Sequence, residues 1–211
     1  MRWRPFDPAT ELPADTHPRL FVAVPLAEGA RGAVEALVGE VRGAVEAGAR
    51  EPRSEVRWVR LDGLHLTIRF LGPTEIDRIP ELAAVVDEAA AASRPFRVSL
   101  SGAGAFPSPA RPRTLWLGVG DGQSELAALS DRINRGLQTA GWARDDRPFT
   151  AHLTLGRADG RREGPLAARE LAARAAGLDA TFAADRLVLY ESLTGGGPAR
   201  YVIRHEARLR G

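Results

Sequence analysis

The chain has 211 residues, a formal net charge of +2 and no cysteine. This length suits a globular protein that buries its own core, and the absence of cysteine excludes disulfides, thiolate zinc sites and a cysteine nucleophile. All basic residues are arginine, a bias that a GC-rich genome explains together with the many Ala, Gly and Pro residues. A guanidinium is nevertheless a good bidentate ligand for phosphate.

Residues 1–18 contain four prolines and no hydrophobic periodicity, so we expect a loose leader there. We expect residues 19–211 to form a single bilobal domain with repeated halves at about 20–105 and 115–209. The sequence shows no apolar core of a signal peptide and no apolar run of membrane-spanning length. We therefore expect a cytoplasmic protein that does not associate with membranes, and we expect it to be a monomer.

The first half of the chain alternates between strand and helix patterns. Apolar runs bounded by Gly and Pro predict strands, and apolar residues at helical spacing predict helices. Thr74 with the acidic residues that follow it has the pattern of a helix N-cap, and we expect Gly102 and Gly104 at β-bulges. The expected elements are a strand at 20–24, a helix at 27–49, a short strand at 56–59, a strand from Leu64 to Gly72-Pro73, a helix at 74–92 and a strand at 96–106.

The second half follows a proline-rich loop at 107–113 and repeats the same pattern. Its expected elements are a strand at 115–119, a helix at 124–140 capped by Gly141, a strand at 149–157, a helix at 166–176, a strand at 187–190 and, after a glycine turn at 195–197, a last strand near Tyr201.

Landmarks in the two halves occur in the same order. Leu20–Val24 matches Leu115–Val119 at an offset of 95, His65 matches His152 at 87, and Phe96 matches Phe182 at 86. This order indicates a duplication. It predicts an α/β (α+β) fold of two lobes related by a pseudo-two-fold axis, with two sheets and outer helices around a central cleft.

Two short stretches on predicted strands repeat one polar pattern, namely His65-Leu66-Thr67-Ile68 and His152-Leu153-Thr154-Leu155. Strict alternation places the His and the Thr of each stretch side by side on one face of its strand. In the first stretch, Arg69 is expected on that same face, and Phe70 is expected on the opposite, core-facing side.

Two histidines brought together in this way supply an acid and a base near neutral pH. That pair suits in-line attack on a phosphodiester, with Thr67 and Thr154 holding the non-bridging oxygens and Arg157 adding a positive charge. The residues alone leave open which histidine is the acid.

A metal site is the rival interpretation, but two histidines with no nearby carboxylate or cysteine are a poor ligand set, so we expect no metal. His17 falls in the leader, and His205 is expected to pack against apolar residues.

A longer ordered set of residues resembles a known family. The set comprises Arg19–Val24, His65–Gly72, Phe106-Pro107, Pro112–Trp116, His152–Arg157 and Leu189–Ser192. It resembles the 2H phosphoesterase superfamily, named for two H-x-T/S-x motifs, and within it the RNA 2′,3′-cyclic phosphodiesterases, historically called 2′-5′ RNA ligases.

The resemblance implies hydrolysis of an RNA 2′,3′-cyclic phosphate end to a 2′-phosphomonoester without a metal or another cofactor. It makes His65 the proton donor and His152 the proton acceptor, and it implies that Arg157 contacts the phosphate. Weaker candidates for base stacking or backbone contact are Phe21, Arg69, Phe106 and Arg113, for each of which a core or surface role is also open.

Two alternatives to this activity stay open. The first is a phosphodiesterase that acts on a small cyclic nucleotide or on an ADP-ribose cyclic phosphate. The second is an RNA-end binding protein that turns nothing over. A 2′-5′ RNA ligase side activity beside the hydrolysis also stays open.

Overall fold

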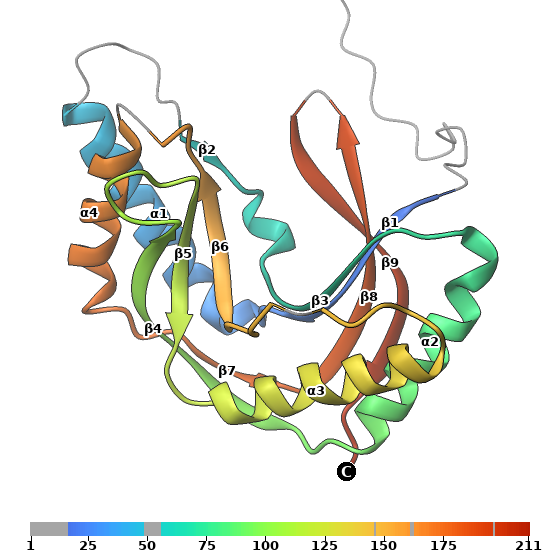
Figure 1. Cartoon of the computed structure of the whole chain (residues 1–211). Helices are drawn as coiled ribbons and strands as arrows, with labels where there is room; N and C mark the ends of the chain where they lie inside the picture. Colours follow the sequence, from blue (N-terminus) through green and yellow to red (C-terminus); the bar gives the residue numbers. More distant parts are fainter. Residues whose placement is uncertain (1–16, 49–55, 146, 161–162, 196) are drawn as a thin grey trace, which may run out of the picture.

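A computed structural model describes residues 17–48, 56–145, 147–160, 163–195 and 197–211, so most of the expected leader lies outside it. The described residues form a curled antiparallel sheet with helices packed against it (Figure 1). The elements are β1 (Arg19–Pro25), α1 (Glu28–Gly48), β2 (Arg57–Trp58), η1 (Leu61–Gly63), β3 (His65–Pro73), η2 (Ile76–Arg78), α2 (Ile79–Ala91), β4 (Phe96–Phe106), β5 (Thr114–Val119), α3 (Gln123–Thr139), β6 (His152–Arg157), α4 (Glu163–Ala175), β7 (Thr181–Ala184), β8 (Arg186–Gly195) and β9 (Gly197–Arg208).

The strands follow the order β7-β4-β5-β6-β3-β1-β8-β9, and β2 adds a short pairing to β6. In the middle of this order, β3 and β6 are joined through one residue pair, Leu66 with Leu153. The two expected sheets are therefore two halves of one hydrogen-bonded path, and the two His strands meet where the halves meet. Among the described residues, no helix has the length and apolarity needed to cross a membrane.

The strand order is symmetric about the β3–β6 contact, but the chain halves exchange elements. Strand β4 pairs with β5 from the second half, and β8 pairs with β1 from the first. The helices exchange likewise, because α1 packs on α4 and α2 packs on α3 (Figure 1). The expected match of Phe96 with Phe182 is wrong, since β4 and β7 are neighbouring strands in which Val98 pairs with Phe182. The counterpart of β4 is β8.

The core lies between the sheet and the helices. Alternate residues of β1 (Leu20, Val22 and Val24) face it, and a stripe along α1 at helical spacing (Val34, Val38, Val41 and Val45) covers it. Each of these side chains is at most 1% exposed. Burial of a full aliphatic side chain contributes about 1.5–3 kcal/mol, so these residues fix the orientation of the strands and hence of the opposite, motif-bearing face.

Helix boundaries follow the expected end signals with one exception. Helix α3 ends with Gly141 at φ +83°, and its backbone N–H donates to the carbonyl of Gln138 at 3.1 Å. The helix expected from Thr74 instead begins at Ile79, after the short 3₁₀ turn η2. The Thr74 hydroxyl donates to the carbonyl of Gly72 at 3.2 Å, and Pro80 occupies the first turn of α2.

The two glycines expected at bulges have different roles. The register of β4 against β5 shifts between Leu100 and Ala103, and Gly102 in this shift has φ +69°. Gly104 lies in regular pairing opposite Trp116. A Cβ atom at Gly104 would lie 2.3 Å from the Trp116 ring, so this position needs glycine to make room for the indole.

Candidate active site

The two repeated motifs meet at the Leu66–Leu153 pair. Because paired residues of adjacent strands point to the same face, both leucines point into the core, where neither is more than 1% exposed. The flanking residues His65, Thr67, His152 and Thr154 are then on the other face, and all four are half-buried. Because the two strands run antiparallel, His65 lies on the side of Thr154, and His152 lies on the side of Thr67.

Both imidazoles are held in the same way. Nδ1 of His65 lies 2.8 Å from the carbonyl oxygen of Gly63, and Nδ1 of His152 lies 2.8 Å from that of Thr150. A carbonyl oxygen only accepts hydrogen bonds, so each Nδ1 carries the proton and each Nε2 remains for chemistry on the motif-bearing face. In both motifs the carbonyl belongs to the residue two positions before the histidine, as a duplication predicts.

His65 is packed among aromatic rings. The ring centroid of Phe21 lies 4.7 Å from that of His65, Tyr201 meets it edge-on at 5.0 Å, and Tyr190 lies 6.0 Å away. Burial lowers the pKa of His65, the hydrogen bond to Gly63 opposes this, and the charge of His152 lowers the pKa further. The charge of His152 is thus close enough to affect the pKa of His65.

His152 has a different setting. Phe106 meets it edge-on at 5.2 Å, and Trp116 lies 6.3 Å away. Phe106 packs on Trp116 at 5.1 Å and keeps 38% of its surface exposed. Each half of the site therefore has one histidine, but the groups around the two histidines differ.

Each motif ends in a β-bulge, at its fourth residue. On β3 the partner changes from Ala23 opposite Thr67 to Val22 opposite Arg69, which leaves Ile68 as the extra residue. On β6 the partner changes from Trp116 opposite Thr154 to Leu115 opposite Gly156, and Leu155 is the extra residue. An extra residue reverses the alternation beyond it.

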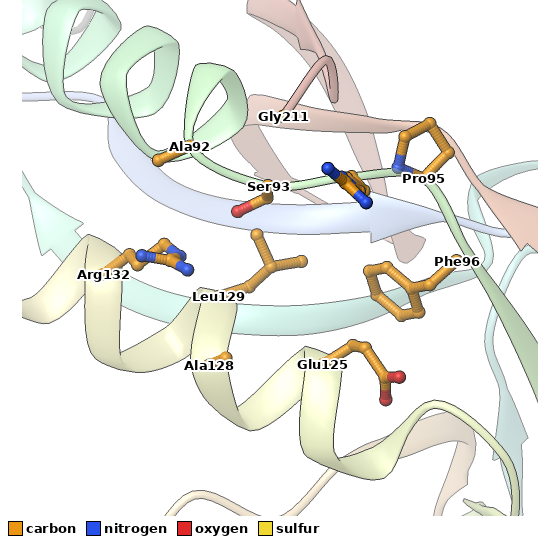
Figure 2. Close-up of a pocket in the computed structure, with 10 residues that line it drawn as sticks. Ala92, Ser93, Pro95, Phe96, Glu125, Ala128, Leu129, Arg132 and Gly211 are labelled. Atoms are coloured by element: carbon orange, nitrogen blue, oxygen red, sulfur yellow. The ribbon is translucent and has the colours of Figure 1, made fainter.

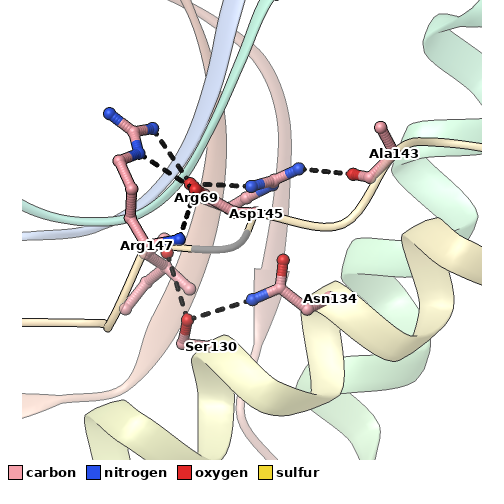
Figure 3. A network of polar contacts seen from close by, with 7 residues as sticks. Arg69, Ser130, Asn134, Ala143, Asp145 and Arg147 are labelled. Atoms are coloured by element: carbon pink, nitrogen blue, oxygen red, sulfur yellow. Dashed lines mark hydrogen bonds and ion pairs between the residues drawn. The ribbon is translucent and has the colours of Figure 1, made fainter.

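This reversal corrects the expected place of Arg69. Its pairing with core-facing Val22 directs it to the helix side of the sheet. There its guanidinium pairs with Asp145 at 2.7 Å and donates to the carbonyl of Ala143 at 2.7 Å, and its side chain is 9% exposed. Figure 3 shows this network beside α3, with Arg147 on the same carboxylate. Arg69 holds the segment after α3 and does not share the face of His65.

The same reversal brings Phe70 to the motif-bearing face. Phe70 pairs with Phe21 across the strands, and the two rings lie 5.9 Å apart. At the corresponding place in the other half, Arg157 pairs with Thr114 and reaches its hydroxyl at 3.5 Å. These registers also correct the repeat alignment, because Val22, rather than Leu20, corresponds to Leu115.

The remaining candidates for substrate contact differ in how exposed their side chains are. Phe21 is 3% exposed and enclosed by other rings, so it packs and offers no free face. Phe106, Arg113 and Arg157 are exposed. Neither Phe70 nor Tyr201 could be placed near the histidines from the sequence. An alternating pattern does not mark the bulge that moves Phe70 to the motif-bearing face, and it does not mark the curl of the sheet that brings Tyr201 against His65.

Other features lie away from the motifs. His205, expected to pack against apolar residues, is 28% exposed, and its Nε2 bonds Asp87 of α2 at 2.8 Å. A hollow of about 430 Å³ (Figure 2) lies between the end of α2, the start of β4 and α3, and none of the expected site residues line it. In the part of the chain that the structure describes, no three His, Cys, Asp or Glu side chains cluster as metal ligands do.

Known proteins match this chain in sequence and in fold. The model of the 2′-5′ RNA ligase superfamily matches residues 30–196. A relative from Archaeoglobus fulgidus named RNA 2′,3′-cyclic phosphodiesterase is 34% identical over 139 residues, which are 66% of this chain and 72% of that protein. One of the same name from Methanothermobacter thermautotrophicus is 31% identical over 144 residues, 68% of this chain and 73% of the relative.

The fold comparison agrees with the sequence. The crystal structure of TT0787 from Thermus thermophilus superposes with a TM-score of 0.71 at 25% identity, over 92% of this chain and 98% of that one. The ligand-free structure of E. coli LigT gives 0.69 at 23% identity, over 92% and 98%. The expected α/β fold around duplicated His strands is thereby confirmed. With its family model matched over most of its length, the chain belongs to the 2′-5′ RNA ligase superfamily, a family of 2H phosphoesterases.

Proposed function

We propose that this protein hydrolyses RNA 2′,3′-cyclic phosphate ends to 2′-phosphomonoesters, with His65 and His152 as acid and base. Two relatives, at 31% and 34% identity, are named RNA 2′,3′-cyclic phosphodiesterase. The observation that carries the proposal is the Leu66–Leu153 pair, because it puts two imidazoles and two hydroxyls from equivalent positions on one face. In-line displacement at phosphorus needs one group that takes a proton and one that gives a proton.

In the proposed reaction, Nε2 of His152 takes a proton from water. The water oxygen bonds to phosphorus opposite the 3′-oxygen, and the bond from phosphorus to the 3′-oxygen breaks. Nε2–H of His65 gives its proton to the departing 3′-oxygen, which leaves a 3′-hydroxyl and a 2′-phosphomonoester. Exchange with solvent then returns His152 to its neutral form and His65 to its protonated form.

The other polar groups act on the phosphate oxygens. The hydroxyls of Thr67 and Thr154 donate to the non-bridging oxygens as negative charge develops there. Arg157 adds a positive charge, and a guanidinium suits a phosphate oxygen. Its place beside Thr114 puts this charge on the His152 half of the site.

One effect opposes the role of His65 as proton donor. Burial lowers the pKa of His65, which favours its neutral form in the free protein. A bound phosphodiester anion stabilises the imidazolium and opposes this effect. We therefore expect the pKa of His65 to be higher in the pH profile of kcat, which reports the substrate complex, than in that of kcat/KM, which reports the free enzyme.

The test uses a short RNA that ends in a 2′,3′-cyclic phosphate, in ¹⁸O-water with EDTA present. Phosphorus NMR should find labelled phosphate on the 2′-oxygen, and His65→Ala and His152→Ala should each slow turnover by roughly 10²–10⁴. The double variant should lose less than the product of the two single losses, because the pair works as a unit. A 3′-phosphate product, or near-normal turnover by either variant, would refute the assignment.

A second substrate separates the acid from the base. When sulfur replaces the 3′-oxygen, the leaving thiolate needs no proton, because thiols have a pKa near 8.5. His65→Ala should then regain most of the lost rate, while His152→Ala should stay slow. The opposite pattern would exchange the two roles.

A further inference from the structure

Each bulge contains one extra residue, and the carbonyl of that residue is held differently in the two halves. In the second motif, the carbonyl of Leu155 accepts a hydrogen bond from the backbone N–H of Val59, directly after β2, at 2.9 Å. In the first motif, the carbonyl of Ile68 accepts a hydrogen bond from a side chain, the hydroxyl of Ser130 on α3, at 3.4 Å. A serine thus does for the first bulge what the main chain does for the second.

Ser130 is a polar residue on an apolar, buried stripe of α3, and it is 2% exposed. Burial of a hydroxyl is unfavourable unless the hydroxyl is hydrogen-bonded. Nδ2 of Asn134, one turn later, donates to Oγ of Ser130 at 3.4 Å, and Oγ–H of Ser130 donates to the carbonyl of Ile68 (Figure 3). These two contacts fix the orientation of the hydroxyl. The other buried residues of the stripe are Leu126, Leu129, Ile133 and Leu137.

We propose that Ser130 is a positioning residue of the active site, because it holds the bulge at Ile68 and thereby keeps the Thr67 hydroxyl on the motif-bearing face. This inference rests on the proposed function, in which that hydroxyl donates to a phosphate oxygen. A shift of the bulge by one residue turns the side chain that it passes to the opposite face of the strand. Thr67 directly precedes Ile68, so a shift towards the motif would turn Thr67 first. A carbonyl anchored on α3 opposes this shift.

The two threonines should therefore depend on Ser130 to different extents. Thr154 occupies the place of Thr67 in the second motif, but the carbonyl of the next residue, Leu155, is held by the main chain. Removal of the Ser130 hydroxyl should disturb the first motif and leave the second intact. The threonine hydroxyls act on charge that develops in the transition state, so the loss should appear in kcat more than in KM.

The experiment is a double-mutant cycle on a short RNA that ends in a 2′,3′-cyclic phosphate. Ser130→Ala should lower kcat by roughly ten- to a hundredfold, because a small misplacement of a positioned group costs about this much, and it should change KM far less. Thr67→Val and Thr154→Val remove the two motif hydroxyls one at a time. Ser130→Ala should add less than about twofold to the loss caused by Thr67→Val, but it should multiply the loss caused by Thr154→Val.

Two variants control for a general effect on α3. Ser130→Thr keeps a hydroxyl at this position and should restore most of kcat. Thr139→Ala removes an exposed hydroxyl of the same helix, which donates to the carbonyl of Arg135 at 3.2 Å, and it should leave kcat unchanged. If Ser130→Ala does not fold, Asn134→Ala replaces it in the cycle, because it removes the group that orients the Ser130 hydroxyl.

The outcomes separate this inference from the proposed function. A serine variant with full kcat, or one whose loss multiplies with both threonine variants, overturns the positioning role and leaves the hydrolase proposal standing. A wild-type protein that hydrolyses no cyclic-phosphate RNA refutes the hydrolase proposal, and NMR then decides the inference. In Ser130→Ala the methyl resonance of Thr67 should move while that of Thr154 stays; an unmoved Thr67 methyl, or equal movement of both, overturns the inference.

Discussion

Arg69→Met separates a structural role of this arginine from a role in substrate binding. The guanidinium pairs with Asp145 at 2.7 Å and donates to the carbonyl of Ala143 at 2.7 Å, and the two charged side chains are 9% and 21% exposed. Methionine keeps much of the volume and removes both contacts. If Asp145 were then left alone, the loss would be about 3–5 kcal/mol.

Asp145 keeps a second partner, however, which reduces the expected loss. Arg147 binds the same carboxylate through Nε and Nη2 at 3.0 Å each, from an exposed position. We therefore expect Arg69→Met to lower the free energy of unfolding by about 2–3 kcal/mol. For a chain of this length that corresponds to a fall in Tm of roughly 5–10 °C.

The assay pairs calorimetric or circular-dichroism melting with kinetics well below the melting temperature. Arg69→Met should melt earlier while kcat/KM on a cyclic-phosphate RNA stays within about threefold of the wild type. Arg147→Met is the matched control, because its side chain is 76% exposed and exposed ion pairs contribute only about 0–1 kcal/mol. An Arg69→Met protein that melts normally but has lost most of its activity would refute the structural role and return Arg69 to the substrate site.

Two further variants test the surroundings of the histidines. Tyr201→Ala removes a ring that packs edge-on against His65, so hydration of the imidazole should raise the pKa of His65 towards its ordinary value; NMR titration of the His65 Cε1 proton checks this, and an unchanged or lowered pKa would contradict it. Gly104→Ala should cost roughly 1–3 kcal/mol in chemical denaturation, because its Cβ would overlap the Trp116 ring. Gly43→Ala is the control, since nothing lies within 4 Å of its Cβ position in α1 and the change should be neutral or stabilising.

The order of strands and helices could be predicted from the sequence because each depends on local patterns. The strand at β1, the long helix α1 and the Gly141 helix end all follow from apolar spacing and from the conformational freedom of glycine. The exchange of β4 and β8 between the halves could not be predicted, because neighbours in a sheet are chosen by tertiary packing. An alignment of the two halves by residue type therefore matched Phe96 with the wrong strand.

In the candidate site too, some features could be predicted from the sequence and others could not. The histidines and threonines precede the bulges, so strict alternation places them correctly on one face. Arg69 and Phe70 follow the bulge, and there alternation gives both of them the wrong face. Ile68 fits an unbroken strand as well as it fits a bulge, which is why the sequence pattern does not reveal the extra residue.

The bulges also explain how a duplicated site acquires a direction. Before them, the two strands carry the same residues, and a symmetric His/Thr pair alone would bind a phosphate equally well in two orientations. Beyond them, the reversed alternation brings to the motif-bearing face a pair of positions that have diverged, an aromatic ring at Phe70 and a guanidinium at Arg157. Burial also lowers the pKa of His65. If the protein acts as proposed, the difference between the two halves, rather than the repeated motif, decides which oxygen leaves.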